Sequence, residues 1–263
     1  MSKSTQGTAV VTGASAGLGR VYADRLARRG YDLILIARRG DRLAEIAAGI
    51  QAQYGVNVST IAADLGKEAD LESVASRLEA DDSITLLVNN AGVSTVAPIG
   101  GTTRAQFDAM NDVNVNGMAR LTYAVLPKFI ARNAGTLVNI GSILGFAHLP
   151  GATIYSGTKG YVNHFTRGLQ NEVAGTKVRV QLVAPSATAT DIWELSGVPL
   201  ENLNQEAVMS AEDCVDAALA GLDLGETVTL PSVEDATLWK QFEELSGKLF
   251  AAAQNRRPAT RYA

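Results

Sequence analysis

The sequence contains little that could build a metal site or a disulfide framework. It has one cysteine, Cys214, and two histidines among 263 residues. A single thiol cannot form an internal disulfide, and one cysteine with two histidines is too few for a metal cluster. We therefore expect a buried, reduced thiol and no metal.

Positive charge and long apolar runs are also scarce. The 23 Lys and Arg residues are outnumbered by 27 Asp and Glu residues, the net charge is −4, and no dense basic block occurs. This pattern does not indicate a nucleic-acid footprint or an anionic membrane surface. The first residues lack a secretory pattern, and no apolar run has the length that a bilayer requires. We expect a cytoplasmic protein with a small-molecule partner, no nucleic acid and no membrane.

Short apolar runs alternate along the chain with stretches of helical period. The apolar runs predict strands at residues 8–12, 32–37, 57–62, 84–89, 135–140, 177–183 and 227–230. The other stretches predict helices at residues 17–29, 41–53, 67–79, 104–133, 153–173, 211–222 and 234–253. The early strands are almost continuously apolar, which is typical of strands buried on both faces of a sheet.

This alternation predicts parallel pairing through right-handed crossovers. The expected fold class is α/β: a single-domain Rossmann fold over residues 1–263, with a doubly wound sheet of about seven parallel strands and helices on both faces. Residues 186–210 are too long for an ordinary connection, so they are either a substrate lid or a surface excursion. Residues 234–263 form a C-terminal extension.

A glycine-rich turn follows the first expected strand. Residues 12–19 read TGASAGLG, and the next helix is expected to begin at Gly17. Such a turn lets the backbone approach a ligand closely, and the helix N-terminus offers N–H groups to an anion. We interpret it as a dinucleotide pyrophosphate site, although glycine turns also follow strands for steric reasons and the spacing differs from G-x-G-x-x-G. Its expected cofactor-binding residues are Gly13, Ser15, Ala16, Gly17, Leu18 and Gly19.

The second expected strand is followed by two arginines, Arg38 and Arg39. Many NAD sites of this architecture place an acid here for the ribose 2′-hydroxyl, whereas an arginine fork suits a 2′-phosphate. NADP(H) is therefore favoured, and NAD(H) stays open because the pair could be a solvated helix entry. After the third strand, Asp64, next to Leu65, could bind the adenine amino group or could be the N-cap of the next helix.

Polar residues follow the fourth and fifth expected strands. Residues 89–92 read NNAG, Ser142 follows the fifth strand in GSILG, and the next helix carries YSGTK at residues 155–159. Strand carboxyl ends meet at one edge of a parallel sheet, and helix residues four apart share a face. We expect Ser142, Tyr155 and Lys159 to converge there, while Asn90, Ala91 and Gly92 leave room for a flat ring.

These motifs resemble those of the short-chain dehydrogenase/reductase superfamily, in its subgroup of compact single-domain oxidoreductases. TGASAGLG is similar to the T-G-x-x-x-G-x-G cofactor motif, NNAG to the sheet-stabilising motif, and YSGTK to the Y-x-x-x-K catalytic motif. The resemblance extends from Thr8 to about Leu230, and Asn114 in VNVNG and Ser142 fall where the family keeps its other two catalytic residues. One departure is Ser186, where the family commonly has glycine after proline.

The resemblance implies hydride transfer between a nicotinamide cofactor and a carbonyl or alcohol. Tyr155 would exchange the proton, Ser142 would hold the substrate oxygen, Lys159 would hold the nicotinamide ribose, and Asn114 would anchor a water. A cation about 4 Å away is strong enough to lower the pKa of a phenol from about 10 toward neutral pH, so we expect Lys159 to lower the pKa of Tyr155. The remaining cofactor residues implied by the family are Pro185, Thr188 and Thr190.

The residues expected around the substrate are mostly apolar: Val93, Ser94, Ser142, Ile143, Leu144, His148, Ile192, Trp193 and Leu195. They favour the NADP(H)-dependent reduction of an apolar ketone or aldehyde, with a 3-oxoacyl thioester as another substrate. Two alternative functions are a catalytically silent NADP(H)-sensing binding protein and an NAD-dependent alcohol dehydrogenase. The family also implies a homodimer or homotetramer, paired through the helices at residues 104–133 and 153–173.

Overall fold

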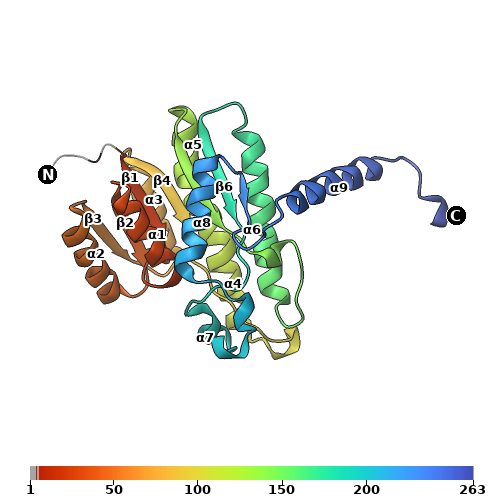
Figure 1. Cartoon of the computed structure of the whole chain (residues 1–263), viewed down its shortest axis with the longest axis horizontal. Helices are drawn as coiled ribbons and strands as arrows, with labels where there is room; N and C mark the ends of the chain where they lie inside the picture. The colour runs from red at the N-terminus through yellow and green to blue at the C-terminus, as the bar shows by residue number, and fades with distance from the viewer. Residues whose placement is uncertain (1–3, 5, 263) are drawn as a thin grey trace. The chain divides into compact units, whose positions relative to one another are not determined.

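The computed structural model describes residue 4 and residues 6–262, and within them one sheet contains seven parallel strands in the order β3-β2-β1-β4-β5-β6-β7 (Figure 1). The strands are β1 (Thr8–Thr12), β2 (Asp32–Ala37), β3 (Val58–Ala62), β4 (Ile84–Asn89), β5 (Gly135–Ile140), β6 (Val178–Val183) and β7 (Val228–Thr229). The expected doubly wound α/β fold is confirmed, and four of the strands have the bounds that the apolar runs predict.

Side chains of neighbouring strand residues point to opposite faces, so a strand inside the sheet packs into two cores. Ala9 and Val11 pack with one set of helices, and Val10 between them packs with the other. The first set is α1 (Gly17–Arg28), α2 (Gly40–Tyr54) and α8 (Ala211–Leu224). The second set is α3 (Glu68–Glu79), α5 (Met118–Ala131) and α6 (Thr153–Glu172). This double burial explains why the early strands are continuously apolar.

Residues 104–133, expected to be one helix, form three consecutive segments. These are α4 (Arg104–Asn111), a π-helical segment η2 (Asp112–Gly117) and α5. The expectation of a regular helix was therefore wrong in its middle, since apolar periodicity does not register one wider turn. Single π turns occur frequently at functional sites, and this one contains Asn114.

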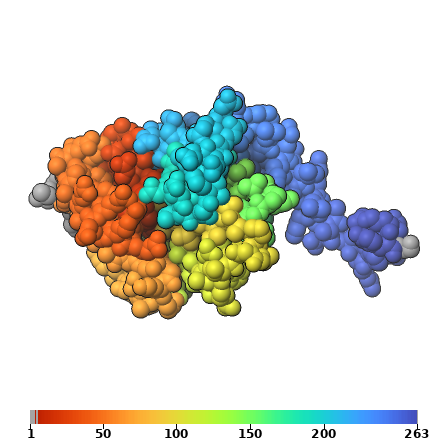
Figure 2. Space-filling model, turned by 90° about the horizontal axis from the view of Figure 1, so that it is seen from below, coloured from red at the N-terminus to blue at the C-terminus, as the bar shows by residue number. Residues whose placement is uncertain are grey.

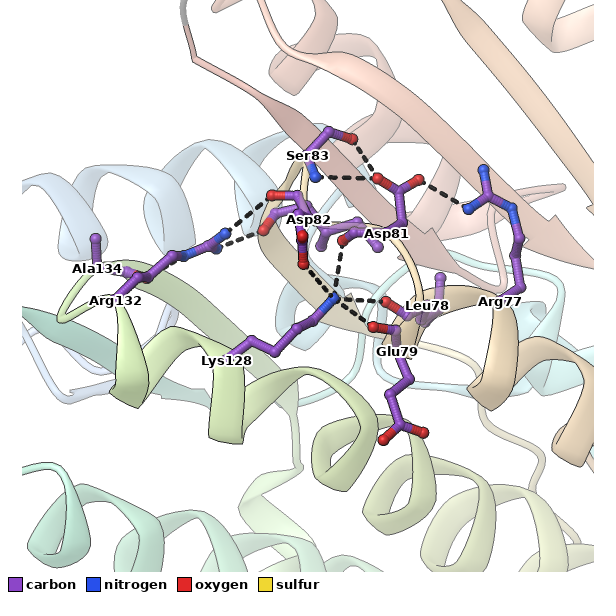
Figure 3. Close-up of polar contacts among 10 residues, drawn as sticks. Arg77, Leu78, Glu79, Asp81, Asp82, Ser83, Lys128, Arg132 and Ala134 are labelled. Carbon is purple, nitrogen blue, oxygen red and sulfur yellow. Dashed lines mark hydrogen bonds and ion pairs between the residues drawn. The ribbon is translucent and has the colours of Figure 1, made fainter.

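The end of α3 is tied to α5 by two basic side chains (Figure 3). Lys128 Nζ donates to the carbonyls of Leu78, Glu79 and Asp81 at 3.2, 2.6 and 3.0 Å. Arg132 donates to the Asp82 carbonyl at 3.2 Å. Because the last carbonyls of a helix lack intrahelical partners, these cations stabilise the C-terminus of α3 and the entry into β4.

The segment expected to be either a lid or a surface excursion, called the lid below, follows β6 and contains α7 (Ile192–Ser196) and two 3-10 turns, η4 (Leu200–Asn202) and η5 (Gln205–Ala207). Its base is closed by a bridge between Thr188 and Met209. Ser196 accepts a backbone hydrogen bond from Val96 at 3.0 Å. Figure 2 shows this segment in cyan against the yellow segment that follows β4 and contains η1 (Ile99–Gly101).

The described chain divides into two compact units, the first ending at Pro231 and the second beginning at Ser232. The second unit contains α9 (Thr237–Ala253) and η6 (Thr260–Tyr262). Large apolar side chains of α9 are exposed, among them Leu245 and Leu249. Over the residues that the structure describes, no helix is both long and apolar enough to cross a membrane.

Candidate active site

The expected cofactor and catalytic residues follow strands at the centre of the sheet. β1 pairs with β2 on one side and with β4 on the other. Doubly wound folds bind ligands outside the carboxyl ends of the strands where the strand order reverses in this way. Residues 13–19 after β1 and residues 90–92 after β4 both lie at this edge.

Asn90 fixes the glycine-rich turn after β1. Its Nδ2 donates to the Thr12 carbonyl at 2.9 Å, and Thr12 Oγ1 accepts from the N–H groups of Asn90 and Ala91, each at 2.9 Å. A Cβ atom on Gly19 would lie 2.3 Å from the carbonyl oxygen of Gly13. Gly13 has a φ of +67°, a value that favours glycine. The turn therefore requires glycine at positions 13 and 19. Without Cβ atoms there, a ligand can approach the backbone of the turn closely.

The N-terminus of α1 fits an anionic ligand. The N-cap residue Ala16 offers no side-chain hydrogen bond, and the first turn contains no acidic residue. The first N–H groups of a helix lack intrahelical partners and lie at the positive end of its dipole. Leu18 packs on the core below, and a Cβ on Gly17 would lie 2.9 Å from Thr190 Cγ2. These residues fit a pyrophosphate placed between the turn and the lid.

Arg39 links the end of β2 to the glycine-rich turn. Its Nε and Nη2 donate to Ser15 Oγ at 3.3 and 3.2 Å, and Arg38 is exposed beside it. The sequence interpretation missed two further charges here, Arg42 and Asp191, because no motif marks them. Asp191 Oδ2 lies 3.7 Å from Arg39 Nη2 and 3.6 Å from Arg42 Nη1.

Asp64 is not the N-cap of α3, so that alternative was wrong. The cap is Lys67, and Asp64 Oδ1 instead accepts a hydrogen bond from the N–H of Gly66 at 3.1 Å. This contact holds the loop after β3 and leaves the other carboxylate oxygen for a further donor. Leu65 is buried in the core on the side of α3.

The structure brings Ser142, Tyr155 and Lys159 together. Ser142 is the N-cap of η3 (Ile143–Gly145), where its Oγ accepts from the N–H of Leu144 at 3.1 Å. The Ser142 hydroxyl also lies near enough to Tyr155 to act on the pKa of its phenol. Lys159 Nζ lies 5.7 Å from the centroid of the Tyr155 ring. These three groups are those that an acid–base reaction at a carbonyl oxygen requires.

Burial determines the protonation of Tyr155 and Lys159 in this structure. It raises the pKa of Tyr155 to about 12, and the nearby Ser142 hydroxyl offsets a smaller part. Burial also lowers the pKa of Lys159 to about 8. The expected lowering of the Tyr155 pKa by Lys159 is therefore not observed. Burial outweighs it, and Lys159 Nζ instead donates to the Ile140 carbonyl at 2.8 Å.

Asn114 lies in the π-helical segment with its side chain fully engaged. Its Oδ1 accepts from the N–H of Val93 at 2.8 Å, and its Nδ2 donates to the Val93 carbonyl at 2.9 Å and to Thr158 Oγ1 at 3.0 Å. Thr158 is part of YSGTK, and a Cβ on Gly92 would lie 3.7 Å from Lys159 Nζ. The side chain thus holds the segment after β4 against α6. Both of its amide hydrogens are used, so the expected water, which stays a prediction, would have to donate to an oxygen of Asn114.

A further buried amide, Asn163, positions Ser142 and was missed by the sequence interpretation. Its Nδ2 donates to the Ser142 carbonyl at 3.1 Å. Cβ atoms on Gly141 and Gly145 would lie 2.1 and 2.2 Å from the Asn163 amide. The only signal in the sequence is the pair of glycines that flanks Ser142 in GSILG.

A cavity of about 570 Å³ lies beside the expected catalytic residues, lined by residues 144–150 and the start of α6. Leu144 and His148 line it as expected, but Ser142 and Tyr155 do not, so it adjoins the reacting groups without containing them. Trp193 is held in the lid by its Nε1, which donates to the Thr188 carbonyl at 2.9 Å. Among the other expected pocket residues, Ser94 and Ile143 are half-buried.

The departure at Ser186 does not strain the backbone. Among the non-glycine residues that the structure describes, a positive φ occurs only at Asn133. Next to Ser186, the Pro185 carbonyl accepts from the N–H of Ile143 at 3.0 Å, which connects the start of the lid to the Ser142 loop. Thr188 is buried at the base of the lid.

Comparisons with known proteins agree with this geometry. The family model described as short chain dehydrogenase matches residues 7–197. Very-long-chain 3-oxoacyl-CoA reductase-B of Danio rerio is 34% identical over 208 residues, which are 78% of this chain and 67% of the relative. The chain therefore spans about two thirds of the length of that reductase, and 65% of its reductase-A counterpart.

Two solved structures are similar over nearly the whole chain. A short-chain dehydrogenase from Sphingobium yanoikuyae in complex with NADPH is 38% identical, with a TM-score of 0.94, and the match covers 98% of this chain and 100% of that one. The bulky-bulky ketone specific alcohol dehydrogenase from Comamonas testosteroni is 35% identical, with a TM-score of 0.88 and coverage of 97% and 98%. With the glycine-rich turn, the half-buried Tyr155 beside buried Lys159 and this family match, the chain belongs to the short-chain dehydrogenase family of oxidoreductases, which transfer hydride with a nicotinamide cofactor.

Proposed function

We propose that the protein is an NADP(H)-dependent oxidoreductase that reduces an apolar ketone or aldehyde to the alcohol. The observation that carries this proposal is the placement of Ser142 and Tyr155 beside buried Lys159, at the strand edge where the glycine-rich turn fits a dinucleotide. A bound nicotinamide would supply the hydride. Residues 13–19 and Thr190 would hold its phosphates and ring, and Lys159 would hold its ribose.

The chain's own residues would handle the proton. The Ser142 hydroxyl would donate to the carbonyl oxygen, and that hydrogen bond would strengthen as negative charge develops on the oxygen. Because the pKa of Tyr155 is raised to about 12, its phenol stays protonated at neutral pH. An alkoxide is more basic than a phenolate, so Tyr155 could protonate it in a downhill step. This protonation state favours the reductive direction.

The proposal of activity is tested by following NADPH absorbance with the wild type and with Tyr155→Phe. We expect turnover by the wild type and a loss of about a thousandfold or more in the variant, with NADPH affinity nearly unchanged. Tight NADPH binding without turnover of any tested carbonyl would instead support the silent sensor. Equal turnover by Tyr155→Phe would remove Tyr155 from the mechanism.

The preference for NADP(H) rests on Arg39, whose guanidinium is held at the glycine-rich turn by Ser15. It is supported by the NADPH complex of the Sphingobium relative. The test compares kcat/KM for NADPH and NADH in the wild type and in Arg39→Ala. The variant should lose efficiency with NADPH only. A wild-type preference for NADH would contradict the proposal and favour the NAD-dependent alcohol dehydrogenase.

The substrate class rests on the apolar lining near Ser142 and on the ketone named for the Comamonas relative, which this chain matches over 98% of that chain's length. A panel should therefore compare bulky apolar ketones with small ketones and a 3-oxoacyl thioester. We expect the highest kcat/KM with the bulky ketones. A higher value with the thioester would point instead to the activity named for the Danio rerio relative.

We also propose a homodimer or homotetramer. Tyr123 on α5 and Tyr161 on α6 are 77% and 42% exposed, and such large apolar side chains suit a contact between copies. Light scattering coupled to size-exclusion chromatography measures the mass directly. A monomer at micromolar concentration would contradict this assembly.

A further inference from the structure

Asp191 connects the lid to the arginines of the adenosine end. Its carboxylate lies 3.7 Å from Arg39 and 3.6 Å from Arg42, while Arg39 also donates to Ser15 on the glycine-rich turn. Asp191 directly follows Thr190, whose Cγ2 would lie 2.9 Å from a Cβ atom on Gly17, at the opposite end of that turn. One carboxylate therefore reaches across the turn and shares the guanidinium that the proposed function assigns to the cofactor.

A carboxylate and a phosphate monoester are recognised by the same guanidinium chemistry. We propose that Asp191 is a specificity-determining residue, which competes with the 2′-phosphate of NADP(H) for Arg39 and Arg42. The inference rests on the proposed NADP(H) site. NADH carries a 2′-hydroxyl instead, which needs no guanidinium, so the competition acts on only one of the two cofactors.

The contacts of Asp191 are weak enough to be displaced. Both distances exceed hydrogen-bond length, and the three side chains are 49%, 49% and 56% exposed. Exposed ion pairs of this kind are worth up to about 1 kcal/mol each, which corresponds to about a fivefold change in affinity. A phosphate brings up to two negative charges and three acceptor oxygens, so it would displace the carboxylate, and Asp191 would then repel it as a neighbouring like charge.

The test is equilibrium binding of NADPH and NADH to the wild type and to Asp191→Asn. Removing the charge should tighten NADPH binding by about two- to fivefold and change NADH binding by less than about twofold. The matched control is Asp223→Asn, since Asp223 forms an exposed ion pair with Arg29 at 2.8 Å, between α8 and the end of α1. The control should change neither affinity.

A second comparison tests whether the effect passes through the arginine. In an Arg39→Ala background, Asp191→Asn should lose most of its effect on NADPH. An Asp191→Asn protein that binds both cofactors more weakly would overturn the inference, because Asp191 would then close over the bound cofactor. Unchanged NADPH affinity in Asp191→Asn would overturn it as well.

Adenosine 2′,5′-bisphosphate and adenosine 5′-monophosphate separate this inference from the proposed function. If neither the wild type nor Asp191→Asn prefers the bisphosphate, the NADP(H) site and the competition both fail. If only Asp191→Asn prefers it, the competition stands while the proposed cofactor of the natural protein is wrong. If the wild type prefers it and Asp191→Asn shows no gain, the cofactor proposal stands and the competition fails.

Discussion

Replacing Lys159 by methionine should stabilise the fold at neutral pH while it removes the proposed activity. Lys159 is 5% exposed, and burial lowers its pKa from 10.5 to about 8. Each pKa unit corresponds to about 1.4 kcal/mol, so holding the buried ammonium costs about 3 kcal/mol below pH 8. Lys159→Met also leaves the Ile140 carbonyl without its charged donor, which costs about 1–3 kcal/mol. The expected net gain at pH 7 is therefore about 1 kcal/mol.

The sign of the pH dependence follows from the same pKa. Between pH 8 and 10.5 the unfolded chain keeps the Lys159 proton that the folded chain has released. The free energy of unfolding of the wild type should therefore rise with pH in this window, relative to Lys159→Met. Above pH 10 the raised pKa of Tyr155 acts in the opposite direction, but both proteins share that residue.

The assay is urea unfolding of the wild type and Lys159→Met at about pH 7 and about pH 9.5. The stability difference should shift by about 2 kcal/mol in favour of the wild type between the two values. Lys177→Met, at an exposed lysine, controls for the substitution itself and should change stability by less than about 0.5 kcal/mol. A variant that is less stable at pH 7, or an advantage that does not change with pH, would refute the reasoning.

Three further outcomes follow from the contacts described above. Gly19→Ala would place a Cβ 2.3 Å from the Gly13 carbonyl oxygen and should weaken NADPH binding about tenfold. The control Gly49→Ala, with open space around the new Cβ, should leave NADPH binding unchanged. Equal affinities of the two variants would contradict the proposed role of the turn. Lys128→Met should lower the free energy of unfolding, measured in urea, by about 1–3 kcal/mol and leave KM unchanged, because three carbonyls lose their charged donor. An unchanged midpoint of urea unfolding would show that Lys128 does not stabilise the C-terminus of α3. The kcat/KM of reduction should be flat at neutral pH and should fall above about pH 8 as Lys159 loses its proton, and a fall centred near pH 10 would assign the change to another group.

The strands could be predicted because buried strands consist of short runs of apolar residues that are visible in the sequence. β1, β2, β4 and β5 have the bounds that their apolar runs indicate, since both faces of each strand are covered by helices. The convergence of Ser142, Tyr155 and Lys159 also followed from chain order, because parallel strands bring their carboxyl ends to one edge.

The π-helical segment and the protonation of Tyr155 could not be predicted in the same way. Helical period places Tyr155 and Lys159 on one face, but it does not say how deeply they are buried or where Nζ points. The structure shows that Nζ is directed to the Ile140 carbonyl, so burial decides both pKa values. The ion pairs of Asp191 join residues far apart in the chain, and no local pattern encodes them.

The buried side chains around the reacting groups have one feature in common: they donate hydrogen bonds to backbone carbonyls at the end of β5 and in the loop that follows it. Lys159 donates to the Ile140 carbonyl and Asn163 to that of Ser142. The geometry is thus fixed before any ligand binds, but at a cost in stability. Within the described part of the chain, Asn163 Oδ1 is buried without a partner, and an unsatisfied buried acceptor costs about 1–3 kcal/mol. Substitutions that stabilise this protein should therefore be found preferentially at this edge of the sheet, and they should lower its activity, as we expect for Lys159→Met.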